Sequence, residues 1–127
     1  MSCAFCLPNA DLYGEIVVRG QFYYALTNPG PVLSAALLLI PYRHAETPFE
    51  LNREEWLELH PLLLQAKAYL DERGADGYSV GWNVGEVAGQ SVPHVHLHVI
   101  GRFANEPLAG KGIRHHLKGP ENRRLES

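Results

Sequence analysis

The sequence predicts an α+β fold whose sheet is mostly antiparallel. Two observations support this prediction: short β-branched or aromatic segments joined by hairpin-length links, and one long amphipathic helix between them. The chain has 127 residues, about the length of one domain, and it is 46% hydrophobic and 20% charged. This composition is typical of a globular protein and argues against wholesale disorder or a fibrous repeat.

The predicted strands lie on both sides of the helix in the sequence. Glu15–Arg19 and Phe22–Thr27 are separated by Gly20-Gln21, as in a hairpin. Ala35–Ile40 is a continuous apolar run, which indicates a central strand buried on both faces. Two further segments, in which side chains of different polarity alternate, complete the predicted set of strands: Tyr78–Asn83 and His94–Ile100.

The main helix is predicted between Asn52 and Gly74. Asn52 and Glu55 have the spacing of a capping box, and Gly74 suits the position after a helix C-terminus. Pro61 removes an internal hydrogen bond and clashes with the preceding turn, so a kink or a break is expected near His60. Apolar residues at three- and four-residue steps predict one buried stripe, made of Trp56, Leu59, Leu63, Ala66 and Leu70.

Charge and composition separate the last part of the chain from the rest. Residues 1–101 contain 5 basic and 11 acidic side chains, whereas residues 102–127 contain 6 basic and 3 acidic ones. The latter stretch is rich in Gly and Pro. It is therefore interpreted as an irregular extension, residues 103–127, of a single domain 1–127 whose core covers about residues 3–102.

The composition disfavours several functional classes. The net charge of −3 argues against binding of a nucleic-acid duplex through its phosphates, although one local site can still bind an anion. The longest apolar run, Ala35–Pro41, is too short to cross a bilayer, so no membrane partner is expected. The N-terminus lacks a secretory pattern, and the cytoplasm is the expected compartment. There, the Cys3-x-x-Cys6 spacing indicates metal binding or redox chemistry more than a disulfide.

Three of the seven histidines alternate with hydrophobic residues over 94–100. On a strand, the imidazoles of His94, His96 and His98 share one face. An edge strand with a polar outer face is the alternative, but Ser, Thr or Lys would serve that purpose. The outer two backbones would lie about 13 Å apart, so one metal could bind all three rings only with a severe bend. A split arrangement is easier, with one outer histidine on a metal and two facing a substrate.

The segment Asn83–Pro93 leads directly into these histidines and combines glycines with small and amide side chains. Glycines let backbone N–H groups approach an anion closely, and Gln90 and Ser91 add neutral donors. A flexible turn between two strands is the alternative interpretation. The segment matches neither a Walker-A motif nor the dinucleotide fingerprint, and it lacks the Gly-x-Ser-x-Gly of serine hydrolases.

Together these residues resemble the histidine-triad (HIT) family of nucleotide hydrolases and transferases, in particular bacterial diadenosine polyphosphate hydrolases. The family pattern His-φ-His-φ-His-φ-φ, where φ is hydrophobic, fits residues 94–100 at every position. The resemblance covers about residues 3–102. Two departures are Ala35-Ala36, where many members have Gly-His, and Asn28, where many have Asp. Other similar positions are Asn83 and Ala88–Ser91 of the phosphate loop, and Pro31 and Leu39–His44 of the ribose-contacting and strand-end segments.

The resemblance implies a fold and a mechanism. The fold is a five-stranded antiparallel sheet with one main helix and a short second helix, extended by edge-to-edge pairing in a homodimer. His96 would attack the α-phosphorus of a nucleotide and form a nucleotidylated imidazole. His98 would bind the α-phosphate, and Gln90 would orient the water or the leaving group. The substrate contacts carried over from the family are Asn28, Asn83, Gly89, Gln90, Ser91 and His98.

The implied substrates are dinucleoside polyphosphates such as diadenosine tetraphosphate, followed by nucleoside phosphoramidates. No redox cofactor is required. Three alternatives remain open: nucleotidyl transfer to an acceptor other than water, a nucleotide-binding scaffold with little turnover, and a hydrolase that uses zinc-activated water. By resemblance, Phe5 and Leu26 would clamp the base, although core packing explains both equally well. The basic extension would be solvated or face a dimer partner, or contact a polyphosphate leaving group.

Some members of the family bind structural zinc through an N-terminal Cys-x-x-Cys and two histidines. The matching residues here are Cys3, Cys6, His44 and His94. Four protein ligands leave no open position, which fits a structural site. The alternatives are that the cysteines act as small hydrophobes, that His44 is a surface residue, or that the two thiols form a redox pair.

Overall fold

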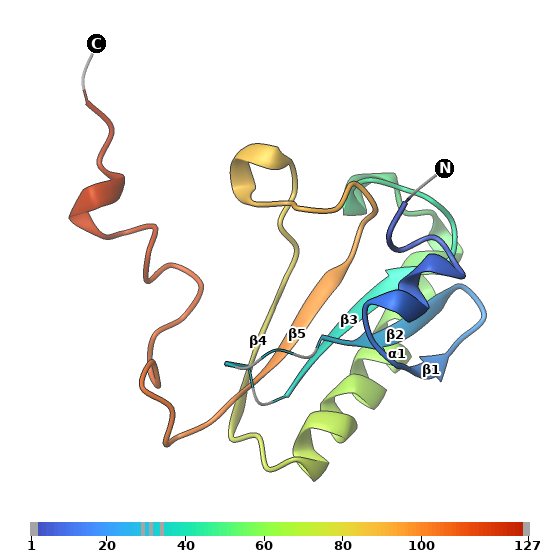
Figure 1. The fold of residues 1–127 in the computed structure, drawn as a ribbon, viewed down its shortest axis with the longest axis horizontal. Coiled ribbons are helices and arrows are strands. Elements are labelled where there is room, and N and C mark those ends of the chain that lie inside the picture. The colour runs from blue at the N-terminus through green and yellow to red at the C-terminus, as the bar shows by residue number, and fades with distance from the viewer. Residues whose placement is uncertain (1–2, 29, 31, 34, 126–127) are drawn as a thin grey trace.

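The computed structural model describes residues 3–28, 30, 32–33 and 35–125, and it forms one antiparallel sheet beside one α-helix (Figure 1). The strand order is β1-β2-β3-β5-β4, and each neighbouring pair is antiparallel. This confirms the predicted α+β class and its five strands. The strands are β1 (Ile16–Arg19), β2 (Tyr23–Thr27), β3 (Ala36–Pro41), β4 (Gly77–Gly81) and β5 (Leu97–Arg102). Pro31 lies outside the described residues.

The α-helix α1 (Arg53–Glu72) begins at the predicted capping box. The backbone N–H of Glu55 donates to Asn52 Oδ1, and the N–H of Asn52 donates to Glu55 Oε1, both at 2.9 Å. No break occurs at Pro61, because the turns on both sides are held by residues buried against the sheet. Short 3-10 turns make up the other helical segments, η1 (Asn9–Leu12), η2 (Pro48–Glu50), η3 (Glu86–Ala88) and η4 (Pro120–Asn122).

The buried stripe of α1 differs from the predicted one at two positions. Leu62 is buried in place of Leu63, and Trp56 is 46% exposed, with its ring 5.9 Å from that of Trp82. Glu55 takes the sheet-facing position in the first turn because its carboxylate pairs with an arginine. Trp56, the apolar residue predicted in this turn, is exposed as a result. The buried residues are Glu55, Leu59, Leu62, Ala66 and Leu70.

The two faces of the sheet are covered by different parts of the chain. Helix α1 packs against one face, where its buried leucines meet Leu97 and Val99 of β5. On the other face, residues 3–12, which we call the N-terminal segment, cover β2 and β3, with Phe5 and Ala10 buried. The part of this second face formed by β4 and β5 lies outside that apolar cluster, and we call it the open face.

The predicted strand His94–Ile100 is only partly correct, because β5 begins at Leu97. The N–H of Val95 donates to Ala45 O at 2.7 Å, which draws residues 94–96 out of the sheet ladder. His94, Val95 and His96 are consequently all buried, so the simple alternation of faces does not apply to them. Similarly, β4 ends at Gly81, before the predicted Asn83.

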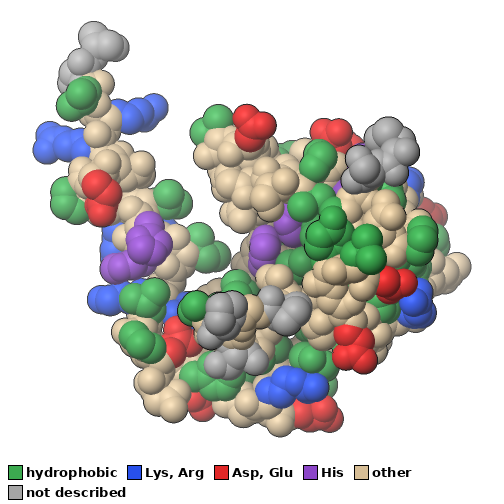
Figure 2. All heavy atoms as spheres, in the orientation of Figure 1, with side chains coloured by type: hydrophobic (Ala, Val, Ile, Leu, Met, Phe, Trp, Pro, Cys, Tyr) green, Lys and Arg blue, Asp and Glu red, His purple; other side chains and the backbone are tan. Residues whose placement is uncertain are grey.

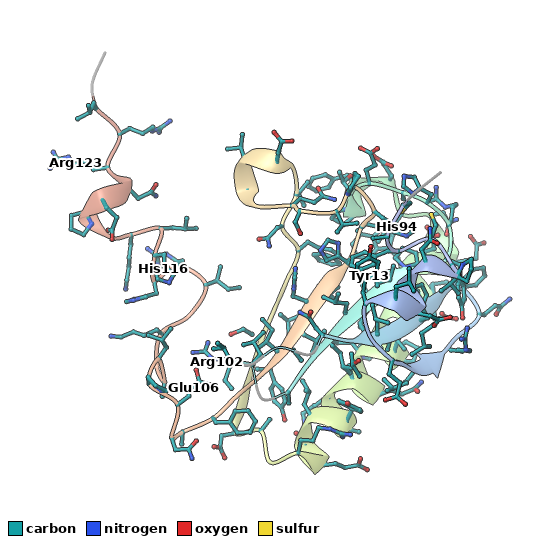
Figure 3. The ribbon with its side chains drawn as sticks, in the orientation of Figure 1. Tyr13, His94, Arg102, Glu106, His116 and Arg123 are labelled. Atoms are coloured by element: carbon teal, nitrogen blue, oxygen red, sulfur yellow. The ribbon has the colours of Figure 1, made fainter. Side chains whose placement is uncertain are left out.

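Residues 103–125, which we call the C-terminal arm, extend away from the sheet beyond β5 (Figure 1). The arm is held at its base, where Arg102 donates to Glu106 Oε2 and to Ser79 Oγ. Figure 3 shows Arg102 and Glu106 together at the point where the arm leaves β5. Within the described part of the chain, no helix has the length and apolarity needed to cross a bilayer.

Candidate functional site

Four residues from three separate segments come together beside the N-terminal segment. One ligand atom from each of Cys3, Cys6, His44 and His94 lies within 4.8 Å of the others. The Nδ1 atom of His94 is 3.3 Å from the Cys3 sulfur and 3.5 Å from the Cys6 sulfur, and His44 Nδ1 is 3.3 Å from the Cys6 sulfur. Tetrahedral zinc places sulfur and nitrogen ligands about 3.5 Å apart, so this group can hold such an ion.

The surroundings of His94 favour metal binding, and those of Cys6 disfavour a thiolate unless a cation is bound. The Nε2–H of the buried His94 donates to Pro41 O at 2.8 Å, so its Nδ1 lone pair is directed at the sulfurs. Burial lowers the pKa of His94, which keeps its ring neutral. Burial and the adjacent Cys3 sulfur raise the pKa of Cys6 to about 11, so a cation is needed to stabilise a thiolate there.

The second imidazole, His96, is fixed by the backbone of the first. Its Nδ1–H donates to His94 O at 2.8 Å, which leaves the Nε2 atom with a free lone pair. Burial lowers the pKa of His96, and the hydrogen bond to the carbonyl opposes this shift. The edge of the Phe5 ring packs against His96, with the ring centroids 4.9 Å apart. At 6% exposure, the imidazole is buried but not sealed. A neutral, oriented imidazole of this kind can act as a nucleophile.

The third imidazole, His98, lies on β5 opposite Leu38 of β3 and Gly81 of β4. It is half-buried, and burial followed by the nearby His96 lowers its pKa. The rings of His96 and His98 are 5.0 Å apart. The three histidines therefore divide into one beside the cysteines and two beside each other.

The loop between β4 and β5 stands at the end of the sheet nearest the histidines (Figure 1). It contains η3 and turns at Gly85 and Gly89, whose φ angles of +89° and +93° favour glycine. The side chain of Gln90 closes the loop: its Oε1 accepts from Gly85 N, and its Nε2 donates to Glu46 O and Val92 O. Both amide donors of Gln90 are thus used within the protein. This geometry indicates that Gln90 shapes the loop.

The remaining residues proposed to contact substrate occupy separate positions around the histidines. Asn28 follows β2 and is half-buried, with its N–H donating to Ala36 O. Asn83 follows β4 and is exposed, as are Gly89 and Ser91 in the loop. Leu26 is buried in the cluster under the N-terminal segment, where packing accounts for it. Asn28 therefore lies in the connection after β2, and the other three lie in the connection between β4 and β5.

Sequence reasoning missed three groups that organise this site. The hydroxyl of Tyr24 donates to Phe5 O and fixes the segment that packs on His96. The carbonyl of Pro41 orients His94, and the carbonyl of Glu46 holds Gln90. Backbone carbonyls carry no side-chain signal, and Tyr24 has the appearance of an ordinary strand residue. Only the three-dimensional arrangement reveals these roles.

Comparison with known proteins gives consistent results. The HIT domain family model matches residues 9–105. The adenosine 5'-monophosphoramidase of Schizosaccharomyces pombe is 30% identical over 122 residues, covering 95% of this chain and 90% of that protein. The bis(5'-adenosyl)-triphosphatase of Dictyostelium discoideum is 33% identical over 103 residues, covering 80% and 69%. The structure of a HIT family member from Bacillus subtilis aligns with a TM-score of 0.72 at 32% identity, covering 83% of this chain and 76% of that one.

Proposed function

The chain belongs to the HIT family, and we propose that it hydrolyses nucleotides at the α-phosphate through a nucleotidyl intermediate on His96. The observation that carries this proposal is the hydrogen bond from His96 Nδ1 to His94 O, which leaves Nε2 unprotonated. His98 lies 5.0 Å away, measured between ring centroids, where it can bind the phosphate oxygens.

The reaction has two displacements at phosphorus. In the first, Nε2 of His96 forms a bond to the α-phosphorus, and the bond from phosphorus to the leaving group breaks. The positive charge that develops on the ring is stabilised by the Nδ1–H bond to His94 O. In the second, water attacks the phosphorus and loses a proton to solvent, the P–N bond breaks, and a nucleoside monophosphate is released. His96 then regains its Nε2 lone pair.

The proposed substrates are dinucleoside polyphosphates, such as diadenosine tetraphosphate, or nucleoside phosphoramidates. Relatives named for each kind of activity support both classes, at 33% and 30% identity. In the proposed complex, Asn28 contacts the ribose, while Asn83, Gly89, Ser91 and the loop shaped by Gln90 surround the phosphates. Phe5 is proposed to pack on the base as well as on His96, because its ring contacts the proposed nucleophile.

A single-turnover experiment with nucleotide labelled at the α-phosphate tests the intermediate. We expect label on the protein after acid quench, and we expect His96→Ala to abolish the label and to reduce turnover by at least about a thousandfold. His60→Ala, which removes an exposed histidine from α1, is the matched control and should retain full activity.

The products distinguish the competing functions. Label that transfers to an added acceptor faster than to water identifies a nucleotidyl transferase. Binding of AMP with turnover unaffected by His96→Ala identifies a binding module. The second result, or label at any other residue, contradicts the proposed mechanism.

We also propose that Cys3, Cys6, His44 and His94 bind a structural zinc ion. The four donors match a closed tetrahedral set, and free thiolate ligands fit a reducing compartment such as the cytoplasm. When bound, zinc would fix the N-terminal segment on the sheet. Chelation should therefore reduce the melting temperature and the activity together. A loss of activity with an unchanged melting temperature would instead indicate zinc-activated water.

A homodimer joined through β4 is a further part of the proposal. β4 is an edge strand, and its Tyr78 and Val80 side chains are 37% and 39% exposed. An unpaired edge of this kind can pair with a second copy and extend the sheet. Light scattering coupled to size-exclusion chromatography should give the mass of two chains, and a single-chain mass would contradict this pairing.

A further inference from the structure

Lysine and arginine side chains are unevenly distributed around the proposed active site. Each one that precedes residue 102 lies away from the open face, on β1, after β3, on α1 or at the C-cap of α1. These residues are Arg19, Arg43, Arg53, Lys67 and Arg73. The folded body therefore offers little positive charge to a polyphosphate.

The C-terminal arm provides the missing charge. Lys111, Arg114 and Lys118 face cavities between the arm and the open face. None of the three takes part in an ion pair with the described residues. Figure 2 shows the hollow between the arm and the body, with basic side chains along the arm and histidines of the body at the opposite wall. An unpaired basic wall opposite a catalytic histidine pair favours an anionic ligand.

The cavity at the base of the arm is mainly apolar. It has a volume of about 460 Å³, within the range of small-molecule sites, and it is lined by Ile100 from β5, Leu33 from the β2–β3 connection and Leu108 from the arm. Ile100 follows His98 by two residues on the same strand, so both side chains point to the open face. An apolar surface thus continues directly from the proposed phosphate site.

A second cavity, of about 740 Å³, lies farther along the arm and contains its cations. Its lining includes Ser79 of β4 together with Lys111, Arg114 and Lys118. The arm returns close to the histidines here, because the Ile113 side chain lies 3.7 Å from the position of a Cβ on Gly81. Gly81 is the register partner of His98. The two cavities share Ser79 and Lys111 in their linings and form one groove, which approaches His98 at Gly81.

We propose that this groove binds the leaving part of a dinucleoside polyphosphate, with the phosphate chain on Lys111, Arg114 and Lys118 and the distal nucleoside on the apolar surface. The inference rests on the proposed function, since it assigns the rest of the substrate that His96 cleaves. The arm then acts as a substrate-specificity element. A phosphoramidate with a small leaving group does not reach the arm, whereas a polyphosphate chain does.

A comparison of two double variants tests the groove. Lys111→Gln/Arg114→Gln removes two cations that line the cavities, and Arg123→Gln/Arg124→Gln removes two cations farther along the arm. Figure 3 shows Arg123 near the far end of the arm. For the first variant we expect kcat/KM for diadenosine tetraphosphate to fall at least tenfold, and kcat/KM for adenosine phosphoramidate to change less than twofold. For the second, both values should change less than twofold.

The salt dependence supplies an independent measurement. Loss of the two lining cations should make log kcat/KM for the tetraphosphate less steeply dependent on log salt concentration, because fewer phosphate charges are neutralised. Equal losses for both substrates, no loss for the tetraphosphate, or equal effects of the two double variants would overturn the proposal. A dimer that dissociates in the first variant would show that the arm serves assembly, and would also overturn it.

Binding to the His96→Ala protein separates failure of the groove from failure of the proposed function. In that protein we expect diadenosine tetraphosphate to bind at least tenfold more tightly than AMP, and the Lys111→Gln/Arg114→Gln changes to remove this difference. If the unsubstituted protein hydrolyses neither diadenosine tetraphosphate nor adenosine phosphoramidate, the proposed function fails while this measurement still decides the groove. Equal affinities for diadenosine tetraphosphate and AMP would contradict the groove even if the tetraphosphate is hydrolysed.

Discussion

The two ends of the chain flank the same face of the sheet but are held in different ways. The N-terminal segment buries Phe5 and Ala10 against β2 and β3, and Tyr24 bonds to its backbone. The C-terminal arm leaves Ile113 and Leu117 66% and 62% exposed, and its ionic anchor lies at its base. Both segments contain only short 3-10 turns, so secondary structure does not distinguish them. The burial of a few apolar side chains therefore accounts for the tighter attachment of the N-terminal segment.

This difference separates stability from specificity. Because the N-terminal segment carries two of the proposed metal ligands and packs on His96, changes there should affect folding, metal content and catalysis together. Because the arm contributes few buried contacts, changes there should affect substrate affinity and leave the core intact. Substitutions at matched positions in the two segments can test this division.

The largest effect is expected from Cys3→Ser/Cys6→Ser. The variant loses two of the four proposed ligands, so it should retain less than a tenth of the bound zinc of the parent protein. The released segment should lower the melting temperature by more than about 10 °C, given about 4 °C per kcal/mol for a chain of this length. Atomic emission for zinc and differential scanning calorimetry measure the two quantities.

The arm offers a matched control for this loss. His115 and His116 have adjacent rings, with centroids 4.9 Å apart, but lie outside the cysteine cluster. His115→Ala/His116→Ala should leave zinc content and melting temperature unchanged. If the two variants lose equal amounts of zinc, the assignment of the ion to the N-terminal segment is wrong.

A comparable effect on stability is expected from Phe5→Ala. Phe5 is 6% exposed, and truncation of a buried aromatic side chain costs about 3–5 kcal/mol. The substitution also removes the ring that packs on His96, so kcat/KM should fall as well. Leu117→Ala is the counterpart in the arm and should change the free energy of unfolding by less than about 0.5 kcal/mol. Urea denaturation of both variants, followed by fluorescence, gives the comparison.

The fold was predictable from the sequence because its signals are local. The capping box at Asn52, the apolar run of β3 and the hairpin before it each depend on neighbouring residues. The helix stripe was predicted less well, because the burial of Glu55 depends on Arg43, twelve residues earlier in the chain. Strand β5 was placed too early, because Val95 pairs with the backbone of Ala45 rather than with a neighbouring strand.

The candidate site also has features that the sequence predicts and features that it does not. The residue types of the triad and of the Cys-x-x-Cys motif are visible in the sequence, and the structure brings Cys3 and Cys6 to His94. The hydrogen bond that orients His94 was not visible, because its acceptor is the backbone carbonyl of Pro41. The groove under the arm also escaped prediction, since it depends on where an irregular segment lies relative to the sheet.

A smaller effect is expected at two ion pairs, Arg43–Glu55 beside α1 and Arg102–Glu106 at the base of the arm. Glu55 is buried and accepts hydrogen bonds from Arg43, next to the proposed ligand His44. Burial raises the pKa of Glu55. The pair with Arg43 and the hydrogen bond from the Asn52 N–H lower it by more, so the net shift of the pKa is downward. Its stabilisation is complete above the ordinary carboxyl pKa and is lost as the pH falls through the lowered value.

Glu55→Gln should therefore cost about 1–2 kcal/mol at pH 7. It should also make the free energy of unfolding less dependent on pH between about pH 5 and pH 3. Glu106→Gln, which weakens the pair with Arg102 at the base of the arm, is the matched variant. It should increase protease cleavage in the arm and leave the unfolding transition of the core in place. An unchanged pH profile in Glu55→Gln would show that the buried pair does not stabilise the body.

The smallest effect on stability is expected from removing the arm after Ala109. This truncation retains the Arg102–Glu106 pair and the hydrogen bond from Arg102 Nη2 to Leu108 O, so the end of β5 stays capped. Because the removed residues are mostly exposed, the melting temperature should change by less than about 4 °C, equivalent to about 1 kcal/mol. The same protein should lose affinity for diadenosine tetraphosphate but keep its affinity for AMP. A large drop in melting temperature would mean that the arm packs on a second copy of the chain, and that the two ends of the chain are both structural.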